Sequence, residues 1–179
     1  VPNVRYEDVG GLDKLLETIR EVAEWPLKHP EWFRTLGVHP HRGALLHGPP
    51  GCGKTLIAQA IASEAGAHFI ALKGPELISK YQGESEENLR AVFEEARQAK
   101  PAIIFFDEID AIGQRRSSEE TLRHEARFVN QLLTLMDGFD GADGIFILAA
   151  TNRPELLDEA LTRAGRFDRS LHIPPPDEA

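Results

Sequence analysis

Sulfur-containing residues are scarce in this sequence of 179 residues, which has one cysteine, Cys52, and one methionine. A single cysteine excludes an internal disulfide, so a small extracellular scaffold held by disulfides is not expected. Long apolar runs are missing as well. The sequence has neither the h-region of a secretory signal nor a stretch long enough to cross a bilayer, and we therefore expect a cytoplasmic or nuclear protein without membrane contact.

Basic residues are in the minority, since 20 lysines and arginines stand against 29 acidic residues and give a net charge of −9. Without a basic excess or a long basic run, nucleic-acid binding is not expected, and a protein partner is favoured. The 41% hydrophobic content is enough for one buried core, so we expect one domain. The chain begins at Val1 and ends after three consecutive prolines, which suggests a fragment of a longer protein.

Short apolar runs rich in β-favouring residues recur along the chain and are separated by helical patterns. The runs are Ala44–His47, His68–Leu72, Ala102–Phe106, Ile145–Ala150 and Ser170–Ile173. Such alternation predicts an α/β fold with a five-stranded, mainly parallel sheet covered by helices on both faces. Two core-facing helical stripes are expected, one around Phe93 and one around Leu132. Before the first strand we expect an amphipathic helix at Leu12–Val22 and then a connection, Pro26–Pro40.

The first strand leads into Gly48–Thr55, which fits the phosphate-loop pattern G-x-x-x-x-G-K-[ST]. Glycines let the backbone N–H groups of such a loop converge on phosphate oxygens. Lys54 is expected to reach the β- and γ-phosphates, and the Thr55 hydroxyl to ligate Mg²⁺. The pattern therefore predicts binding of a nucleotide with its magnesium ion.

Carboxylates follow the third strand directly, at Asp107 and Glu108. Ligands of parallel sheets bind at the carboxyl ends of the strands. We expect Asp107 to act on Mg²⁺, directly or through water, and Glu108 to polarise the water that attacks the γ-phosphate. Asp110 has two interpretations, a cap for the helix that follows or a part in this acidic group.

Two further groups follow the later strands. Asn152, after the fourth strand, is placed to sense the γ-phosphate or hold the attacking water, although an Asn before Arg-Pro is also ordinary turn chemistry. Arg163, Arg166 and Arg169 lie within seven residues before the last strand. Arginine beside a phosphoryl-transfer site supplies transition-state charge, from the same chain or from a neighbour.

These segments together resemble the large α/β subdomain of a classical AAA ATPase, in the valosin-containing-protein and NSF group. The matching segments cover nearly the whole chain in family order: Asp8–Leu12, Gly48–Thr55, Gly74–Leu77, Gly83–Glu86, Ile104–Asp110, Asp137–Phe139, Ala150–Pro154 and Gly165–Arg169. The resemblance implies a P-loop NTPase fold for residues 1–179, with an N-terminal helix and linker at 1–42 and the core at 43–179. The helical lid of the family is expected after Pro176 and is therefore expected to be absent from this chain.

The resemblance also implies an ATP-hydrolysing ring, usually a hexamer, that unfolds or remodels protein clients through a central pore. It assigns nucleotide contacts, catalysis and client contact to particular positions. The nucleotide contacts are Asp8, Gly10, Pro50, Gly51, Cys52, Gly53, Lys54, Thr55 and Leu56, with Asp8 and Gly10 flanking adenine. Glu108 is the implied catalytic acid residue, Asn152 sensor 1, Arg163 and Arg166 the arginine fingers, and Tyr81 the pore-loop aromatic.

Several alternatives are weighed against this assignment. A GTPase is disfavoured because the sequence lacks Asn-Lys-x-Asp chemistry, and His124-Glu125 lacks the second histidine of a zinc-protease site. A non-hydrolysing nucleotide-binding scaffold and a remodeller of nucleic-acid complexes stay open as alternatives. Tyr81 also fits simple packing, and the charges of Arg115–Arg127 fit either a second pore loop or a solvated face. Without a lid, we expect this fragment to bind nucleotide but turn it over weakly.

Overall fold

The computed structural model describes residues 1–2, 13–50, 53–79, 82–111, 119–138, 144–157 and 159–175. In this part of the chain, strands alternate with helices. The strands are β1 (Gly43–His47), β2 (His68–Lys73), β3 (Ala102–Asp107), β4 (Ile145–Thr151) and β5 (Arg169–His172). The α-helices are α1 (Asp13–Ile19), α2 (Trp25–Lys28), α3 (Pro30–Leu36), α4 (Lys54–Ala65), α5 (Gly74–Ser79), α6 (Gln82–Gln98) and α7 (Glu119–Asp137).

The five strands form one sheet in the order β2-β3-β4-β1-β5, and all four strand pairings are parallel. The predicted five-stranded sheet is therefore confirmed, and each strand lies within one residue of its expected start or end. Because the strands are parallel, their carboxyl ends lie along one edge. The segments that follow β1, β3 and β4 are neighbours at that edge, although they are far apart in sequence.

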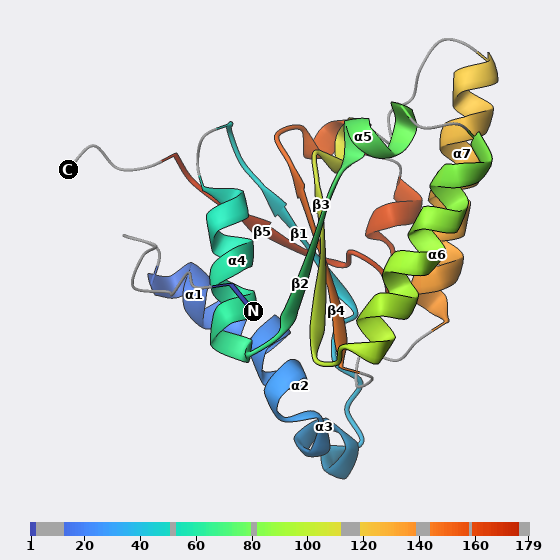
Figure 1. The fold of residues 1–179 in the computed structure, drawn as a ribbon. Coiled ribbons are helices and arrows are strands. Elements are labelled where there is room, and N and C mark those ends of the chain that lie inside the picture. Colours follow the sequence, from blue (N-terminus) through green and yellow to red (C-terminus); the bar gives the residue numbers. More distant parts are fainter. Residues whose placement is uncertain are drawn as a thin grey trace.

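Helices cover both faces of the sheet (Figure 1). On one face, α1 and α4 pack with strand residues such as Leu46, Phe105 and Leu148. On the other, α6 and α7 pack with the alternate strand residues, such as Leu45, Ile104 and Phe106. Side chains alternate between the two faces along a strand, so every central strand is apolar on both sides.

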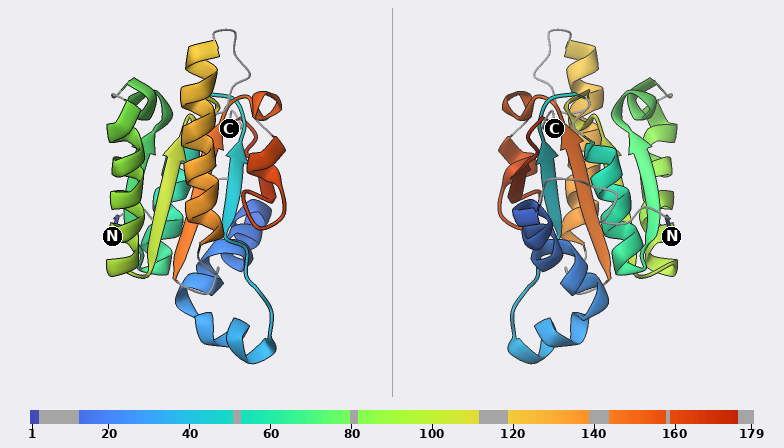
Figure 2. Two further views of the ribbon diagram at one scale, coloured as in Figure 1. Left: turned by 90° about the vertical axis from the view of Figure 1, so that its right-hand side faces the viewer. Right: turned by 90° about the vertical axis from the view of Figure 1, so that its left-hand side faces the viewer.

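The expected stripes of α6 and α7 are confirmed as core. Leu89, Phe93 and Ala96 of α6 are each at most 1% exposed, and Leu132 and Met136 of α7 are fully buried. These helices lie side by side along the sheet (Figures 1 and 2).

The N-terminal region differs from the expectation for Pro26–Pro40, because this segment contains most of α2 and all of α3. Pro30 lies in the first turn of α3, where a missing N–H costs nothing, so it starts a helix instead of ending one. Pro26 lies in a helical run that continues from α1 into α2, because Ile19, Glu24 and Trp25 all have right-handed helical backbone angles. Between α1 and α2, residues 20–24 form a π-helical turn, with the Trp25 N–H donating to the Arg20 carbonyl. Helices α2 and α3 extend beyond the end of the sheet (Figure 2).

None of the helices in the described part of the chain is long and apolar enough to cross a membrane.

Candidate functional site

The phosphate loop connects the end of β1 to the start of α4. Gly53, just before the helix, has a φ of 83°, a left-handed conformation that favours glycine. Lys54 is the first residue of α4 and is only 9% exposed. Its Nζ donates to the carbonyls of Gly48 and Pro49, both at 3.0 Å, and to Asn152 Oδ1 at 2.7 Å. The ammonium is therefore held between the loop and the end of β4.

The carboxylates of β3 lie beside the start of α4. The Thr55 hydroxyl donates to Asp107 Oδ2 at 3.5 Å, so a hydroxyl and a carboxylate face each other, as the magnesium prediction requires. Next in the chain, Glu108 is exposed and has a φ of 53°. Its N–H donates to Asp107 Oδ1 at 3.0 Å, and its carbonyl accepts from Ala111 N–H at 3.0 Å.

Gly74 makes room for the left-handed backbone of Glu108. A Cβ at Gly74 would lie 2.3 Å from the Glu108 carbonyl oxygen, a distance that no side chain tolerates. The start of α5 therefore packs directly on the backbone of Glu108. A left-handed glutamate costs of the order of 1–3 kcal/mol and persists where its surroundings fix it.

Asp110 has a partner at the end of β4. It lies inside the short 3₁₀ helix η3 (Ile109–Ala111), and its Oδ1 accepts the Thr151 hydroxyl at 2.8 Å. The same hydroxyl accepts from Arg153 N–H at 3.0 Å. Thr151 is 1% exposed, so this buried contact ties the end of β3 to the end of β4 and orients the turn that carries Asn152.

These groups line one pocket of about 580 Å³, a volume in the usual range for ligand sites. Its lining residues are Pro50, Gly53, Lys54, Thr55, Leu56, Gln59, Asp107, Glu108 and Asn152. All but Gln59 were expected from the sequence. Gln59 lies four residues after Thr55 and shares its helix face, so helical spacing could have identified it.

Chemically, this pocket suits a polyphosphate and a magnesium ion. The N-terminal N–H groups of α4 and the Lys54 ammonium attract phosphate oxygens. Mg²⁺ prefers oxygen ligands and is usually held by one or two protein groups together with substrate phosphates and water. The Thr55 hydroxyl and the Asp107 carboxylate fit that requirement.

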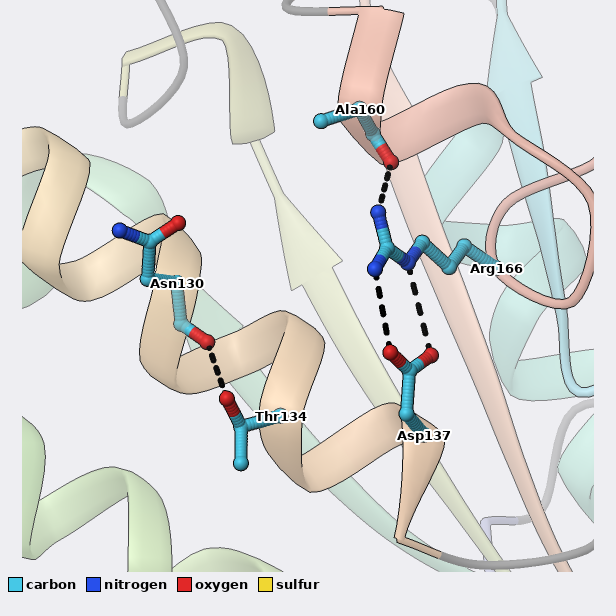
Figure 3. Close-up of polar contacts among 5 residues, drawn as sticks. All are labelled: Asn130, Thr134, Asp137, Ala160 and Arg166. Atoms are coloured by element: carbon cyan, nitrogen blue, oxygen red, sulfur yellow. Dashed lines mark hydrogen bonds and ion pairs between the residues drawn. The ribbon is translucent and has the colours of Figure 1, made fainter.

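The arginine cluster lies apart from this pocket, and neither Arg163 nor Arg166 lines it. Arg166 is bound within its own chain, by the carboxylate of Asp137 and the carbonyl of Ala160 (Figure 3). The expectations for Asp8, Gly10, Gly51, Cys52 and Tyr81 lie outside the described residues. So do the side chains of His124 and Glu125 and most of the segment 115–127.

A histidine pair beside the loop was not expected. His47 ends β1 and faces His172 of β5, with ring centroids 5.2 Å apart. Burial lowers the pKa of His47, and the nearby His172 and Lys54 lower it further. The neutral imidazole is therefore favoured, so the charge of Lys54 dominates this end of the loop.

Comparison with known proteins gives a consistent result. The model of the ATPase family associated with various cellular activities (AAA) matches residues 44–175. The chain is 56% identical over 178 residues to the cell division cycle protein 48 homolog of Archaeoglobus fulgidus, covering 99% of this chain and 24% of that protein. It is 51% identical over 180 residues to human ATPase family gene 2 protein homolog A, covering 100% of this chain and 20% of the relative.

A third relative is the proteasome-activating nucleotidase of Methanopyrus kandleri, which is 55% identical over 179 residues, covering 99% of this chain and 41% of that protein. The chain spans about a quarter of the length of the Archaeoglobus protein. Because the family model covers most of the chain and these relatives are more than half identical across it, we conclude that this chain belongs to the AAA family of ATPases.

Proposed function

We propose that this domain binds ATP with Mg²⁺ and hydrolyses it to ADP and phosphate. The observation that carries the proposal is the meeting of Lys54, Asp107, Glu108 and Asn152 in one pocket, at the ends of three adjacent strands. A nucleotide site that only bound its ligand would not need an exposed carboxylate beside the phosphate position.

In this proposal, Lys54 and the N–H groups at the start of α4 bind the β- and γ-phosphates. Pro50 and Leu56 line the same pocket and contact the nucleotide. Asp8 and Gly10 keep the place beside adenine that the resemblance gives them.

In the same proposal, Glu108 and Asn152 carry out the hydrolysis step. Glu108 accepts a proton from the attacking water. A general base must lie within hydrogen-bond distance of that water, and the fixed backbone of Glu108 helps to hold its carboxylate in place. Asn152, held against Lys54 at 2.7 Å, orients that water toward the γ-phosphate. Thr55 and Asp107 hold Mg²⁺, which, when bound, neutralises charge on the phosphate oxygens.

The full-length protein is proposed to be a homo-oligomeric ring, a hexamer by family resemblance, in which arginine from one subunit completes the site of the next. Its clients are proposed to be proteins in the cytoplasm, with Tyr81 in contact with the client. Support comes from relatives named cell division cycle protein 48 homolog and proteasome-activating nucleotidase. The chain alone is proposed to turn over ATP weakly, since it holds one side of each shared site.

The test separates binding from hydrolysis. By calorimetry, Lys54→Ala should weaken ADP binding about 100-fold, because buried charge-assisted contacts are lost. Lys14→Ala, which removes an exposed lysine of α1, should leave the affinity unchanged. In the full-length protein, Glu108→Gln should bind ATP normally and release no phosphate. Equal affinity of wild type and Lys54→Ala, or turnover by Glu108→Gln, would refute the respective assignment.

A further inference from the structure

Two histidines face each other beside the phosphate loop. His47 ends β1 and is paired in register with His172 of β5, and their ring centroids lie 5.2 Å apart. The backbone around His47 is fixed on both sides. The His47 carbonyl accepts the Ile173 N–H at 2.8 Å, and the Gly48 N–H donates to the Thr151 carbonyl at 3.3 Å. The pairing of the strands therefore keeps the two imidazoles close together.

A third basic group, the Lys54 ammonium, lies close to this pair. Its Nζ donates at 3.0 Å to the carbonyl of Gly48, the residue that follows His47. His47 is half-buried, whereas His172 is exposed. Burial, His172 and Lys54 all lower the pKa of His47, because each of them disfavours a further positive charge at this position. The free site therefore favours a neutral His47.

The groups that surround His47 come from three elements. β5 supplies His172 and α4 supplies Lys54, both basic, while the neighbouring residue of β4, Thr151, is uncharged. The Asp110 carboxylate accepts the Thr151 hydroxyl at 2.8 Å. A bound nucleotide changes this balance, because its phosphates bring negative charge to Lys54. Negative charge nearby favours the protonated imidazole, so the pKa of His47 should rise when the pocket fills.

We propose that the histidine pair couples nucleotide binding to proton uptake, an inference that rests on the proposed binding of nucleotide in this pocket. When phosphates reach Lys54, the repulsion that kept His47 neutral is offset, and His47 takes up a proton from solvent. A site that takes up a proton as it binds its ligand binds that ligand more tightly at lower pH. Mild acidification therefore raises nucleotide occupancy, and His172 sets the pH range in which it does so.

Calorimetry of ADP binding to this chain, without added Mg²⁺, tests the coupling. Binding enthalpies are measured at one pH in two buffers that differ in ionisation enthalpy, and their difference gives the number of protons taken up. A terminal phosphate itself titrates at about pH 6, so the result is read as the difference between wild type and His47→Gln. The matched control is His68→Gln, which removes a partly exposed histidine from β2, at the opposite edge of the sheet from β5.

Wild type should take up a larger fraction of a proton than His47→Gln. Its affinity for ADP relative to that of His47→Gln should rise about 5-fold or more between about pH 7.5 and about pH 5.5, the lower end of ordinary coupling between two sites. His172→Gln should still take up a proton, with the maximum at a higher pH, because one of the groups that oppose protonation of His47 is gone. His68→Gln should match wild type.

NMR titration of wild type makes the test independent of any variant, since the pKa of His47 should be higher with ADP bound than in the free protein. The inference is overturned if ADP leaves that pKa unchanged, or if wild type and His47→Gln take up the same number of protons at every pH. Equal losses of uptake in His68→Gln and His47→Gln, or an unshifted maximum in His172→Gln, would also overturn it. If wild type does not bind ADP, the proposed function fails as well, whereas ADP binding without these differences overturns only the coupling.

Discussion

The packing of Gly74 against Glu108 gives a sharp prediction about the geometry of catalysis. A methyl group at Gly74 would lie 2.3 Å from the Glu108 carbonyl oxygen and 3.3 Å from the Ala111 Cβ, whereas real Cβ atoms essentially never come closer than 3.0 Å to another heavy atom. The nearer atom is backbone and has no rotamer to escape into. Gly74→Ala must therefore push the start of α5 and the backbone of Glu108 apart by several tenths of an ångström.

Two consequences of different size are expected. Overpacking of this kind costs about 1–3 kcal/mol of unfolding free energy, measurable by urea denaturation of the domain. In the full-length protein, displacement of the proposed catalytic carboxylate should lower kcat by up to about 10²-fold. Nucleotide affinity should be nearly unchanged, because Lys54 and Thr55 belong to α4, which contains neither Gly74 nor Glu108.

Gly37→Ala is the control. Its added Cβ would meet nothing within 4 Å, and Gly37 ends α3, away from the pocket. Its φ of 66° makes alanine cost some stability, but kcat should stay near the wild-type value. If Gly74→Ala leaves kcat unchanged as Gly37→Ala does, the steric reasoning is wrong.

Two further predictions concern the edge of the sheet. Thr151→Val should lower the unfolding free energy by about 1–3 kcal/mol, because the Asp110 carboxylate and the Arg153 N–H lose a buried partner. Thr151→Ser keeps the hydroxyl and should lose less stability. An equal loss for both variants in chemical denaturation would contradict this account. For His47, burial and the nearby His172 and Lys54 lower the pKa below 6.5, so folding disfavours the charged form and stability falls as the pH drops through and below 6.5. On acidification, the melting temperature of His47→Gln should therefore fall less than that of wild type. NMR titration should show a higher pKa of His47 in His172→Gln than in wild type. A His47 pKa at its ordinary value in wild type would refute the predicted pH dependence.

The sheet and most of the pocket could be predicted from the sequence because their signals are local. A parallel strand that is buried on both faces is a short continuous apolar run, and the polar residues that follow such runs must meet at one edge. Lys54, Thr55, Asp107, Glu108 and Asn152 were found in this way. The contacts that hold these residues and their neighbours in place could not be predicted from the sequence.

What could not be predicted depends on distances between elements. The Asp137 carboxylate lies 29 residues before Arg166, and no periodicity indicates that the end of α7 meets this turn. The sequence left two interpretations of Asp110 open, and neither included its contact with Thr151, because that contact arises only when β3 and β4 pair. The proline at position 30 was misleading because proline breaks a helix in its interior yet suits its first turn.

Helix α7 has a mechanical consequence beyond the anchoring of one arginine. It runs without interruption over 19 residues, about 28 Å at the rise of an α-helix. Its first residues belong to the segment 115–127, and its last residue, Asp137, holds Arg166 of the turn before β5. Because an α-helix is stiff along its axis, a displacement at its first turn is carried over this length to Asp137 and, through the ion pair with Arg166, to the turn before β5.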